Sequence, residues 1–217
     1  MQMTDAIYGA PPVDLGQIDL SPTEMMFWLY CPIKLPGQIG VTMPSNLERF
    51  GTLVDAVAAD SKKWKPSYVY ITAKTLFATA ENPGNRPGWH SDGFLTDDFN
   101  YIWCDANPTV FFESGEQRFA FVKDHLRSLG EMDDLCQPNR ACWRTYPVKH
   151  LMRLDQTVLH KVSTDIKPGV RTFVKISVSK HRYALRGNSI NHTLAPNWSY
   201  QNRGPELNCP ITGEAAQ

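Results

Sequence analysis

Six segments of the chain are rich in β-branched and aromatic residues, a composition that predicts β-strands. These segments cover residues 67–77, 88–94, 100–105, 109–112, 148–160 and 172–179. Clusters of turn-forming residues separate them at positions 81–87, 106–108 and 166–169. Many short strands divided by such turns are typical of a β-sandwich or a jelly roll. The pattern therefore predicts a mainly β fold.

Two other segments place apolar residues at helical spacing. The first begins at a capping box formed by Ser45 and Glu48 and continues through about Lys62. The second begins near Ser114, carries an apolar stripe, and meets a glycine stop at Gly130. We expect both helices to support the outside of a sheet.

The length of 217 residues predicts a single domain that spans positions 1–217. Residues 1–20 contain two adjacent prolines and show no clear period, so we expect an irregular arm. Residues 67–182 hold the predicted β core, and residues 183–217, with Asn, Pro and Gly throughout, are expected to form an irregular tail. No internal repeat is visible.

The charges balance at 22 Lys plus Arg against 22 Asp plus Glu, which disfavours strong nonspecific binding to nucleic acid or anionic lipid. A local basic strip at residues 62–65 is better explained as a solvated helix end. The N-terminus has neither a basic region nor an apolar run, and no stretch approaches membrane-spanning length. We therefore expect a soluble cytoplasmic protein without a membrane partner.

Five cysteines occur without a CxxC pair, which argues against a structural zinc site and favours a reducing compartment. Cys136 and Cys142 are the one pair spaced closely enough to share a metal or a bridge, although buried or idle thiols explain them better. The sequence also lacks the GxSxG elbow of many hydrolases and the HExxH motif of zinc proteases.

The most informative chemistry lies at His90 and Asp92, two positions apart on a predicted strand. Side chains at this spacing point to the same face, so an imidazole and a carboxylate can reach one ion. His160, on a distant strand, offers a second imidazole. Two His and one carboxylate with open positions opposite are the ligand set of non-haem Fe(II) oxygenases. Arg171 adds a cation suited to binding a carboxylate in bidentate fashion.

The order His-x-Asp, a long gap, His, and then Arg about ten residues later resembles the Fe(II)/2-oxoglutarate-dependent dioxygenases. The resemblance covers about residues 68–179 and extends to the superfamily, not to one member of it. It implies a double-stranded β-helix, that is, a cupin-like jelly roll with supporting helices. It also implies His90, Asp92 and His160 as iron ligands, and Arg171 as the partner of the distal carboxylate of 2-oxoglutarate. The implied reaction is a hydroxylation that consumes O2 and releases succinate and CO2.

Further contacts follow less directly from the residues. Tyr70 and Thr109 are candidate donors to the co-substrate, and Lys74 and Lys175 are alternative partners for its carboxylate. Trp89, beside the first ligand, and Arg86, in the preceding loop, are candidate substrate contacts. Packing of the aromatic rings and exposure of Arg86 are the ordinary alternatives. If His160 were not a ligand, His150 would be the first substitute.

The resemblance leaves the substrate open. Short length and neutral charge favour a small molecule or a free amino acid, while a nucleobase or a protein side chain remains an alternative. Two other classes compete with the oxygenase. One is a metal-binding jelly roll that uses no keto acid, and the other is a β protein that binds neither metal nor co-substrate.

Overall fold

The computed structural model describes residues 2–22, 24–194 and 197–203, and the ten strands of this part of the chain form two antiparallel sheets. The larger sheet has the order β1-β8-β5-β10-β3-β2 and the smaller one the order β4-β9-β6-β7. In chain order the strands are β1 (Val13–Gln17), β2 (Met26–Lys34), β3 (Tyr68–Ala78), β4 (His90–Ser91), β5 (Phe99–Cys104), β6 (Val110–Phe112), β7 (Trp143–Thr145), β8 (His150–Leu154), β9 (Leu159–Lys161) and β10 (Gly169–Ser179).

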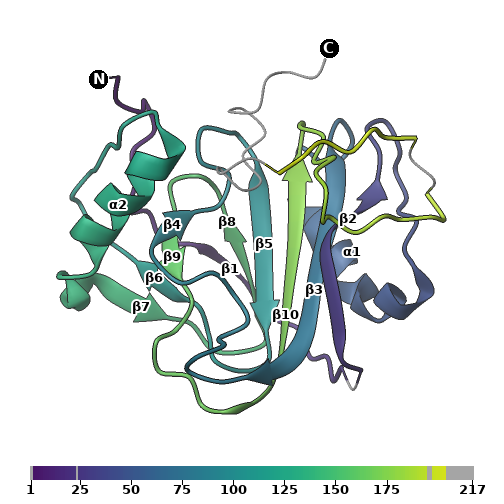
Figure 1. The fold of residues 1–217 in the computed structure, drawn as a ribbon, viewed down its shortest axis with the longest axis horizontal. Helices are drawn as coiled ribbons and strands as arrows, with labels where there is room; N and C mark the ends of the chain where they lie inside the picture. The colour runs from purple at the N-terminus through teal and green to yellow at the C-terminus, as the bar shows by residue number, and fades with distance from the viewer. Residues whose placement is uncertain (1, 23, 195–196, 204–217) are drawn as a thin grey trace.

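From β3 to β10 the chain passes back and forth between the sheets in the pattern of a double-stranded β-helix, with β6 and β7 paired consecutively in the smaller sheet. Strands β3, β5, β8 and β10 lie in the larger sheet, and β4, β6, β7 and β9 form the smaller one. The sheets face each other, as Figure 1 shows. The predicted jelly roll is therefore confirmed.

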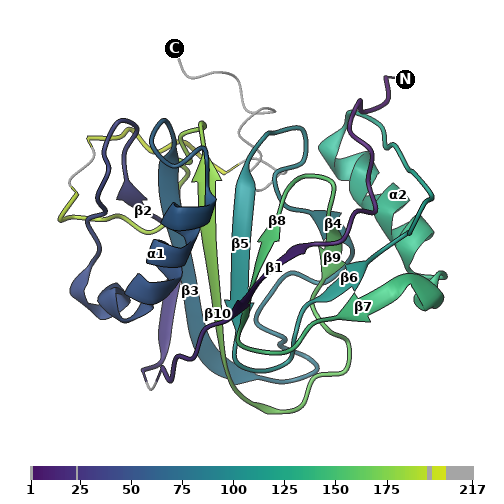
Figure 2. The same cartoon turned by 180° about the vertical axis from the view of Figure 1, so that it is seen from behind.

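Each sheet has a helix on its outer side. Helix α1 (Gly51–Asp60) covers the larger sheet and buries Leu53, Val54 and Val57 against apolar residues of β3 and β10 (Figure 2). Helix α2 (His125–Cys136) packs beside the smaller sheet through Met132 and Cys136. Neither helix is long and apolar enough to cross a bilayer, and the same holds for every helical segment within the described ranges.

The first predicted helix forms, but its predicted cap does not. A 3₁₀ segment, Ser45–Phe50, leads into α1, and the residue at its N-cap is Pro44, without a side-chain hydrogen bond. Leu47 N donates instead to Pro44 O at 2.8 Å. The capping-box prediction at Ser45 and Glu48 was wrong because the chain enters the helical segment one residue earlier, directly from the extended Pro44.

The second predicted helix starts about eleven residues too early. Asp124 is the actual cap, since its Oδ1 accepts from Arg127 N at 2.9 Å. The Ser114 hydroxyl instead donates to Gly9 O at 3.1 Å, and Phe119 forms a β-bridge with Tyr8 of the N-terminal arm. Gly130 lies inside α2, not at its end. Pairing with the arm therefore outcompetes the helical period over residues 114–123.

The predicted strand at 148–160 is two strands in two different sheets. A turn separates them, in which the Asp155 carboxylate accepts from Thr157 N at 2.8 Å. β8 stays in the larger sheet, while β9 crosses to the smaller one and pairs with β4. This crossing brings His160 next to His90. Strand β1 also forms within the segment expected to be irregular, and pairs with β8.

Candidate metal centre and its cavity

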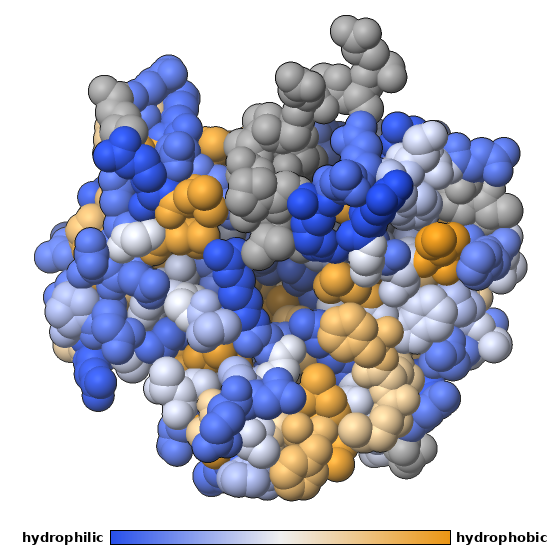
Figure 3. Space-filling view, viewed as in Figure 1, coloured by the Kyte–Doolittle hydropathy of each residue, from blue (hydrophilic) through white to orange (hydrophobic). Residues whose placement is uncertain are grey.

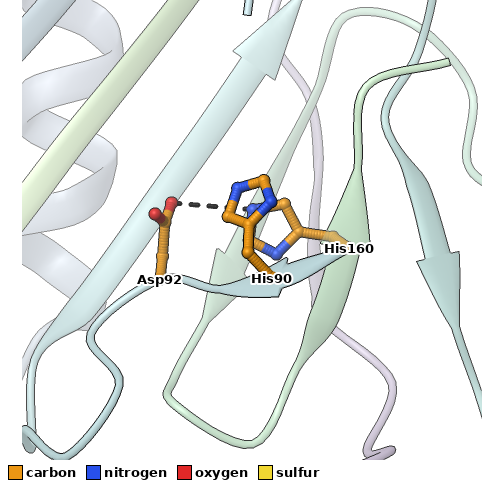
Figure 4. A group of neighbouring side chains, drawn as sticks. All are labelled: His90, Asp92 and His160. Atoms are coloured by element: carbon orange, nitrogen blue, oxygen red, sulfur yellow. Dashed lines mark ion pairs between the residues drawn. The ribbon is translucent and has the colours of Figure 1, made fainter. Parts of the chain in front are cut away.

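Two histidines face each other across the β4–β9 pair. His90 and His160 are direct partners in the antiparallel register, and their ring centroids lie 4.4 Å apart. Asp92 follows β4 at the first position after it, and its Oδ2 lies 3.7 Å from His160 Nε2. One ligand atom from each of the three residues lies within 4.8 Å of the others. Figure 4 shows the three side chains converging on one region.

Backbone carbonyls orient both imidazole rings. His90 Nδ1 lies 2.9 Å from Gly88 O, and His160 Nδ1 lies 3.4 Å from Val158 O. A proton on Nδ1 leaves the Nε2 lone pair available for a metal, which is how carbonyls commonly fix the tautomer of a ligating histidine. Gly88 has a φ of +88°, a conformation that favours glycine and that turns its carbonyl toward His90.

The environment favours the protonation states that a metal needs. Burial lowers the pKa of His160 to about 3, and burial also lowers the pKa of His90. Burial alone would raise the pKa of Asp92, but the Lys175 ammonium and the neighbouring His160 and His90 together outweigh it and hold that pKa well below its usual range. Near neutral pH the triad therefore offers two neutral imidazoles and one carboxylate.

Lys175, on β10, holds the carboxylate of the triad. Its Nζ lies 3.2 Å from both oxygens of Asp92 and 2.9 Å from the Tyr30 hydroxyl. Tyr30 sits at a register shift in the β2–β3 pairing and has a φ of 45°, which is uncommon for a residue with a side chain. The strained position brings its hydroxyl to Lys175.

Three cations occupy neighbouring positions on the inner side of the β3–β10 pair. Arg171 and Lys175 are four residues apart on β10, and Lys74 lies opposite Phe173 between them. Burial lowers the pKa of Lys74 to about 8. The Lys74 ammonium donates to Gly84 O at 3.1 Å. Together they form the cationic row Lys74, Arg171 and Lys175.

Arg171 is only 2% exposed, and its guanidinium is partly satisfied by the protein. Nε donates to Ala106 O at 2.9 Å. With the side-chain amide of Asn85 oriented so that its nitrogen donates to Gly84 O, its oxygen accepts from Arg171 Nη1 at 3.2 Å. Nη2 is buried and has no hydrogen-bond partner within the described residues. An unpartnered buried donor is costly, so an incoming acceptor would be stabilised here.

A cavity of about 400 Å³ opens beside the triad, within the usual range for small-molecule sites. The face in Figure 3 is hollowed near its centre, and both polar and apolar surfaces border the hollow. The cavity is lined by all three triad residues and by five cations, Lys74, Arg86, Lys161, Lys175 and Arg203. Asp92 is the sole acidic side chain among the described lining residues.

The other predicted contacts divide into two groups. Thr109 and Arg86 line the cavity, as expected for residues that meet a co-substrate or a substrate. Tyr70 and Trp89 do not line it. The Tyr70 hydroxyl donates to His181 O and accepts from Tyr183 N, both at 3.0 Å. Trp89 is 1% exposed and packs against Trp143 in the apolar cluster under α2.

The prediction that Trp89 contacts the substrate was wrong, because its side chain points away from the cavity. Trp89 directly precedes β4, and on the predicted strand its side chain would point to the face opposite to that of His90, away from the metal site. Tyr70 shares the inward parity of Lys74, but the segment after β10 folds over it and takes up its hydroxyl. Tyr30 was missed because no sequence signal marks the register shift that positions it.

His150 pairs with a carboxylate away from the triad, and the cysteines among the described residues are free thiols. His150 Nδ1 lies 2.9 Å from Asp14 Oδ2, away from the triad. Cys136 and Cys142 are free thiols, and burial raises the pKa of Cys136 well above its usual value. Cys209 lies outside the described residues.

A second group of potential ligands, Asp97, Asp98 and His181, converges at another place. Two lysines already pair with Asp97, Lys63 at 3.4 Å and Lys180 at 3.3 Å, and the Tyr183 hydroxyl donates to Asp98. The positive neighbours disfavour a metal ion there.

The donor set at His90, Asp92 and His160 fits a divalent transition metal. Imidazole nitrogens and one carboxylate on one side, with the cavity on the other, match the facial arrangement of non-haem Fe(II) sites. An octahedral ion held by three protein ligands keeps three positions for other molecules. The structure thus supports a metal site with an open side.

No family model matches the chain, and no curated protein matches it. Among solved structures it is similar to an oxidoreductase of the 2OG-Fe(II) oxygenase family from Burkholderia pseudomallei, with 11% sequence identity and a TM-score of 0.35. The match covers 80% of this chain and 75% of that one. At this similarity the function has to be argued from the site.

Proposed function

We propose that the protein is an Fe(II)- and 2-oxoglutarate-dependent oxygenase that hydroxylates a small molecule or an amino-acid-like substrate. The observation that carries the proposal is a triad of two histidines and one carboxylate in a cavity that is also lined by the partly buried Lys74 and Lys175, with the buried Arg171 next to them on β10. The triad alone would fit many metalloproteins. The cations add the requirement for an anionic ligand beside the metal.

The charges of the row fit a dicarboxylate. Lys74, Arg171 and Lys175 carry three positive charges near neutral pH. Among the described residues Asp92 pairs with Lys175, and Asp105 lies close enough to act electrostatically on Arg171. Buried cations without partners are costly, so a ligand with two carboxylates would offset the excess. 2-Oxoglutarate has that charge, and its keto acid group can also chelate iron.

The protein residues have separate tasks in this proposal. His90, Asp92 and His160 hold Fe(II), and the Gly88 and Val158 carbonyls keep their imidazoles oriented. Arg171 and Lys74 hold the distal carboxylate, with Thr109 as a further donor in the cavity wall. When bound, Fe(II), 2-oxoglutarate and O2 supply an oxidant for a substrate C–H bond, and succinate and CO2 are released.

The cavity mouth favours an anionic substrate. Arg86 lines the cavity close enough to act electrostatically on His90, and no ion pair engages it within the described residues. The Lys74 ammonium holds the same loop at Gly84, and Asp133 accepts from Trp89 N at 2.8 Å on its other side. Arg86 is therefore well placed to bind a substrate carboxylate. The free thiols Cys31, Cys104 and Cys136 are in keeping with action in the cytoplasm.

The test is a screen for 2-oxoglutarate-dependent succinate release in the presence of Fe(II) and O2. We expect slow uncoupled release without substrate, and faster release with some amino acids or small carboxylic acids. Nucleosides, peptides and uncharged analogues in the same screen test the alternative substrates. Arg86→Gln should reduce the acceleration by acids, whereas Arg118→Gln, at an exposed site, should not. Metal binding without any succinate would favour a jelly-roll protein that uses no keto acid.

A further inference from the structure

Lys175 engages the metal-binding carboxylate on both of its oxygens. The two Nζ–oxygen distances to Asp92 are equal, at 3.2 Å, and the side chains are 12% and 18% exposed. A charge-assisted contact of this kind is strong because little water screens it. In this arrangement the ammonium lies where it competes with a metal for the same carboxylate.

The competition cannot be relieved by moving the strand. Lys175 pairs with Thr72 of β3 on one side and with Ile102 of β5 on the other. Its backbone is thus fixed in the middle of the larger sheet. A metal at Asp92 needs at least one carboxylate oxygen, so the side chain of Lys175 has to give up part of its contact.

The released ammonium has few partners within reach. Asp92 is the only acidic side chain among the described residues that line the cavity, and Tyr30 offers a neutral hydroxyl. Its neighbours in the cationic row, Lys74 and Arg171, carry the same charge. An anion entering the cavity is the remaining group that can restore a charged partner to Lys175.

We propose that Lys175 exchanges partners, from the Asp92 carboxylate in the metal-free protein to a carboxylate of the co-substrate once the metal has bound. The proposal rests on the function proposed above. It makes Lys175 a positioning residue that couples two binding events. Metal binding frees the ammonium for the dianion, and the dianion removes the competitor of the metal. Because such coupling is reciprocal, each ligand raises the affinity for the other by the same factor.

Replacing the lysine should therefore change the two affinities in opposite directions. We expect Lys175→Met to bind Mn(II) more tightly than the wild type in the absence of 2-oxoglutarate, by about fivefold or more. The same variant should bind 2-oxoglutarate more weakly in the presence of Mn(II), and the mutual enhancement should shrink toward none. Electron paramagnetic resonance measures Mn(II) binding, and calorimetry measures 2-oxoglutarate binding. Neither readout needs turnover.

Lys74→Met is the matched control, because it removes a lysine from the same row without a hydrogen bond to Asp92. It should weaken 2-oxoglutarate binding without tightening Mn(II) binding to the same extent. Circular dichroism and thermal unfolding establish that both variants are folded. If Lys175→Met misfolds, Lys175→Gln provides a second neutral side chain for the same measurements.

Two results would overturn the exchange. Weaker or unchanged Mn(II) binding in folded Lys175→Met would mean that the ammonium orients Asp92 for the metal or has no effect on it. Equal mutual enhancement in wild type and variant would remove the coupling role. A wild-type protein that binds Mn(II) but not 2-oxoglutarate would contradict the proposed function, while tighter Mn(II) binding in the variant would still demonstrate the competition at Asp92.

Discussion

Strand β10 has two faces of opposite character. Toward α1 it presents Val174, Ile176 and Val178, which are buried in the largest apolar cluster. Toward the smaller sheet it presents Phe173 and Lys175, with Arg171 at the same parity. One face contributes stability through apolar burial, and the other carries buried charges that favour folding only when a partner offsets them. The difference suggests that the cavity face is maintained for binding.

The largest effect is expected where this cavity face meets the metal ligands. His160→Ala should lower Mn(II) affinity by more than about 100-fold, since changes that merely disturb a ligand's hydrogen-bond partner already cost 10–100-fold. His150→Ala, which removes a histidine paired with Asp14, should leave that affinity near the wild-type value. Equal losses in both variants, measured by equilibrium dialysis, would remove His160 from the site.

The next effect concerns the cationic row. Arg171→Met should weaken 2-oxoglutarate binding by about 100-fold, because breaking a buried pair costs roughly 3–5 kcal/mol and Lys74 remains. Arg171→Lys should also weaken it, since a point charge cannot replace the planar fork. Arg153→Met, at an arginine paired with Asp60 away from the cavity, serves as control. Calorimetry on Mn(II)-loaded protein that shows wild-type affinity in Arg171→Met would contradict the assignment.

The apolar face should respond in stability and not in binding. Ile176→Val removes one methylene-sized group from a residue that is 1% exposed, and should lower the free energy of unfolding by about 0.5–1.5 kcal/mol. Urea unfolding measures this change, and the Mn(II) affinity of the folded variant should be unaltered. A clear loss of metal affinity would mean that the two faces of β10 are not independent.

The smallest effect is a pH dependence from Lys74. Burial lowers the pKa of this residue to about 8, so its charge is present below pH 8 and is lost as the pH rises through that value. The affinity for 2-oxoglutarate should therefore fall above pH 8, by no more than about tenfold per pH unit for one linked proton. Lys74→Arg, which stays charged, should flatten the profile. A wild-type profile equally flat up to pH 10 would exclude this role for Lys74.

The sequence predicted the parts of the site that depend on local geometry. The spacing of His90 and Asp92 predicted that both side chains reach one ion, although the strand ends at Ser91, and the resemblance linked them to His160 and Arg171. The position of Trp89 next to His90 also predicted that its side chain points to the opposite face, which would have excluded that residue from the cavity. The number of strands predicted a sandwich or a jelly roll, and the resemblance selected the jelly roll. The split between β8 and β9 was missed, although the polar residues Asp155, Gln156 and Thr157 interrupt the segment where the turn forms.

The features that the sequence did not predict depend on contacts between distant segments. The N-terminal arm pairs with residues 119 and 122 and so displaces the predicted start of α2. Tyr183 lies after the last strand, yet its backbone N–H donates a hydrogen bond to the Tyr70 hydroxyl. The Lys175–Asp92 pair joins residues 83 positions apart, and Tyr30 reaches it from a strand that no pattern predicted.

The most direct test of the central claim is an anaerobic titration of the Fe(II)-loaded protein with 2-oxoglutarate, followed by visible absorption. We expect a weak charge-transfer band that saturates with the co-substrate and is absent in His90→Ala, Asp92→Ala and His160→Ala. A band of unchanged intensity in all three variants would contradict the assignment of the metal site.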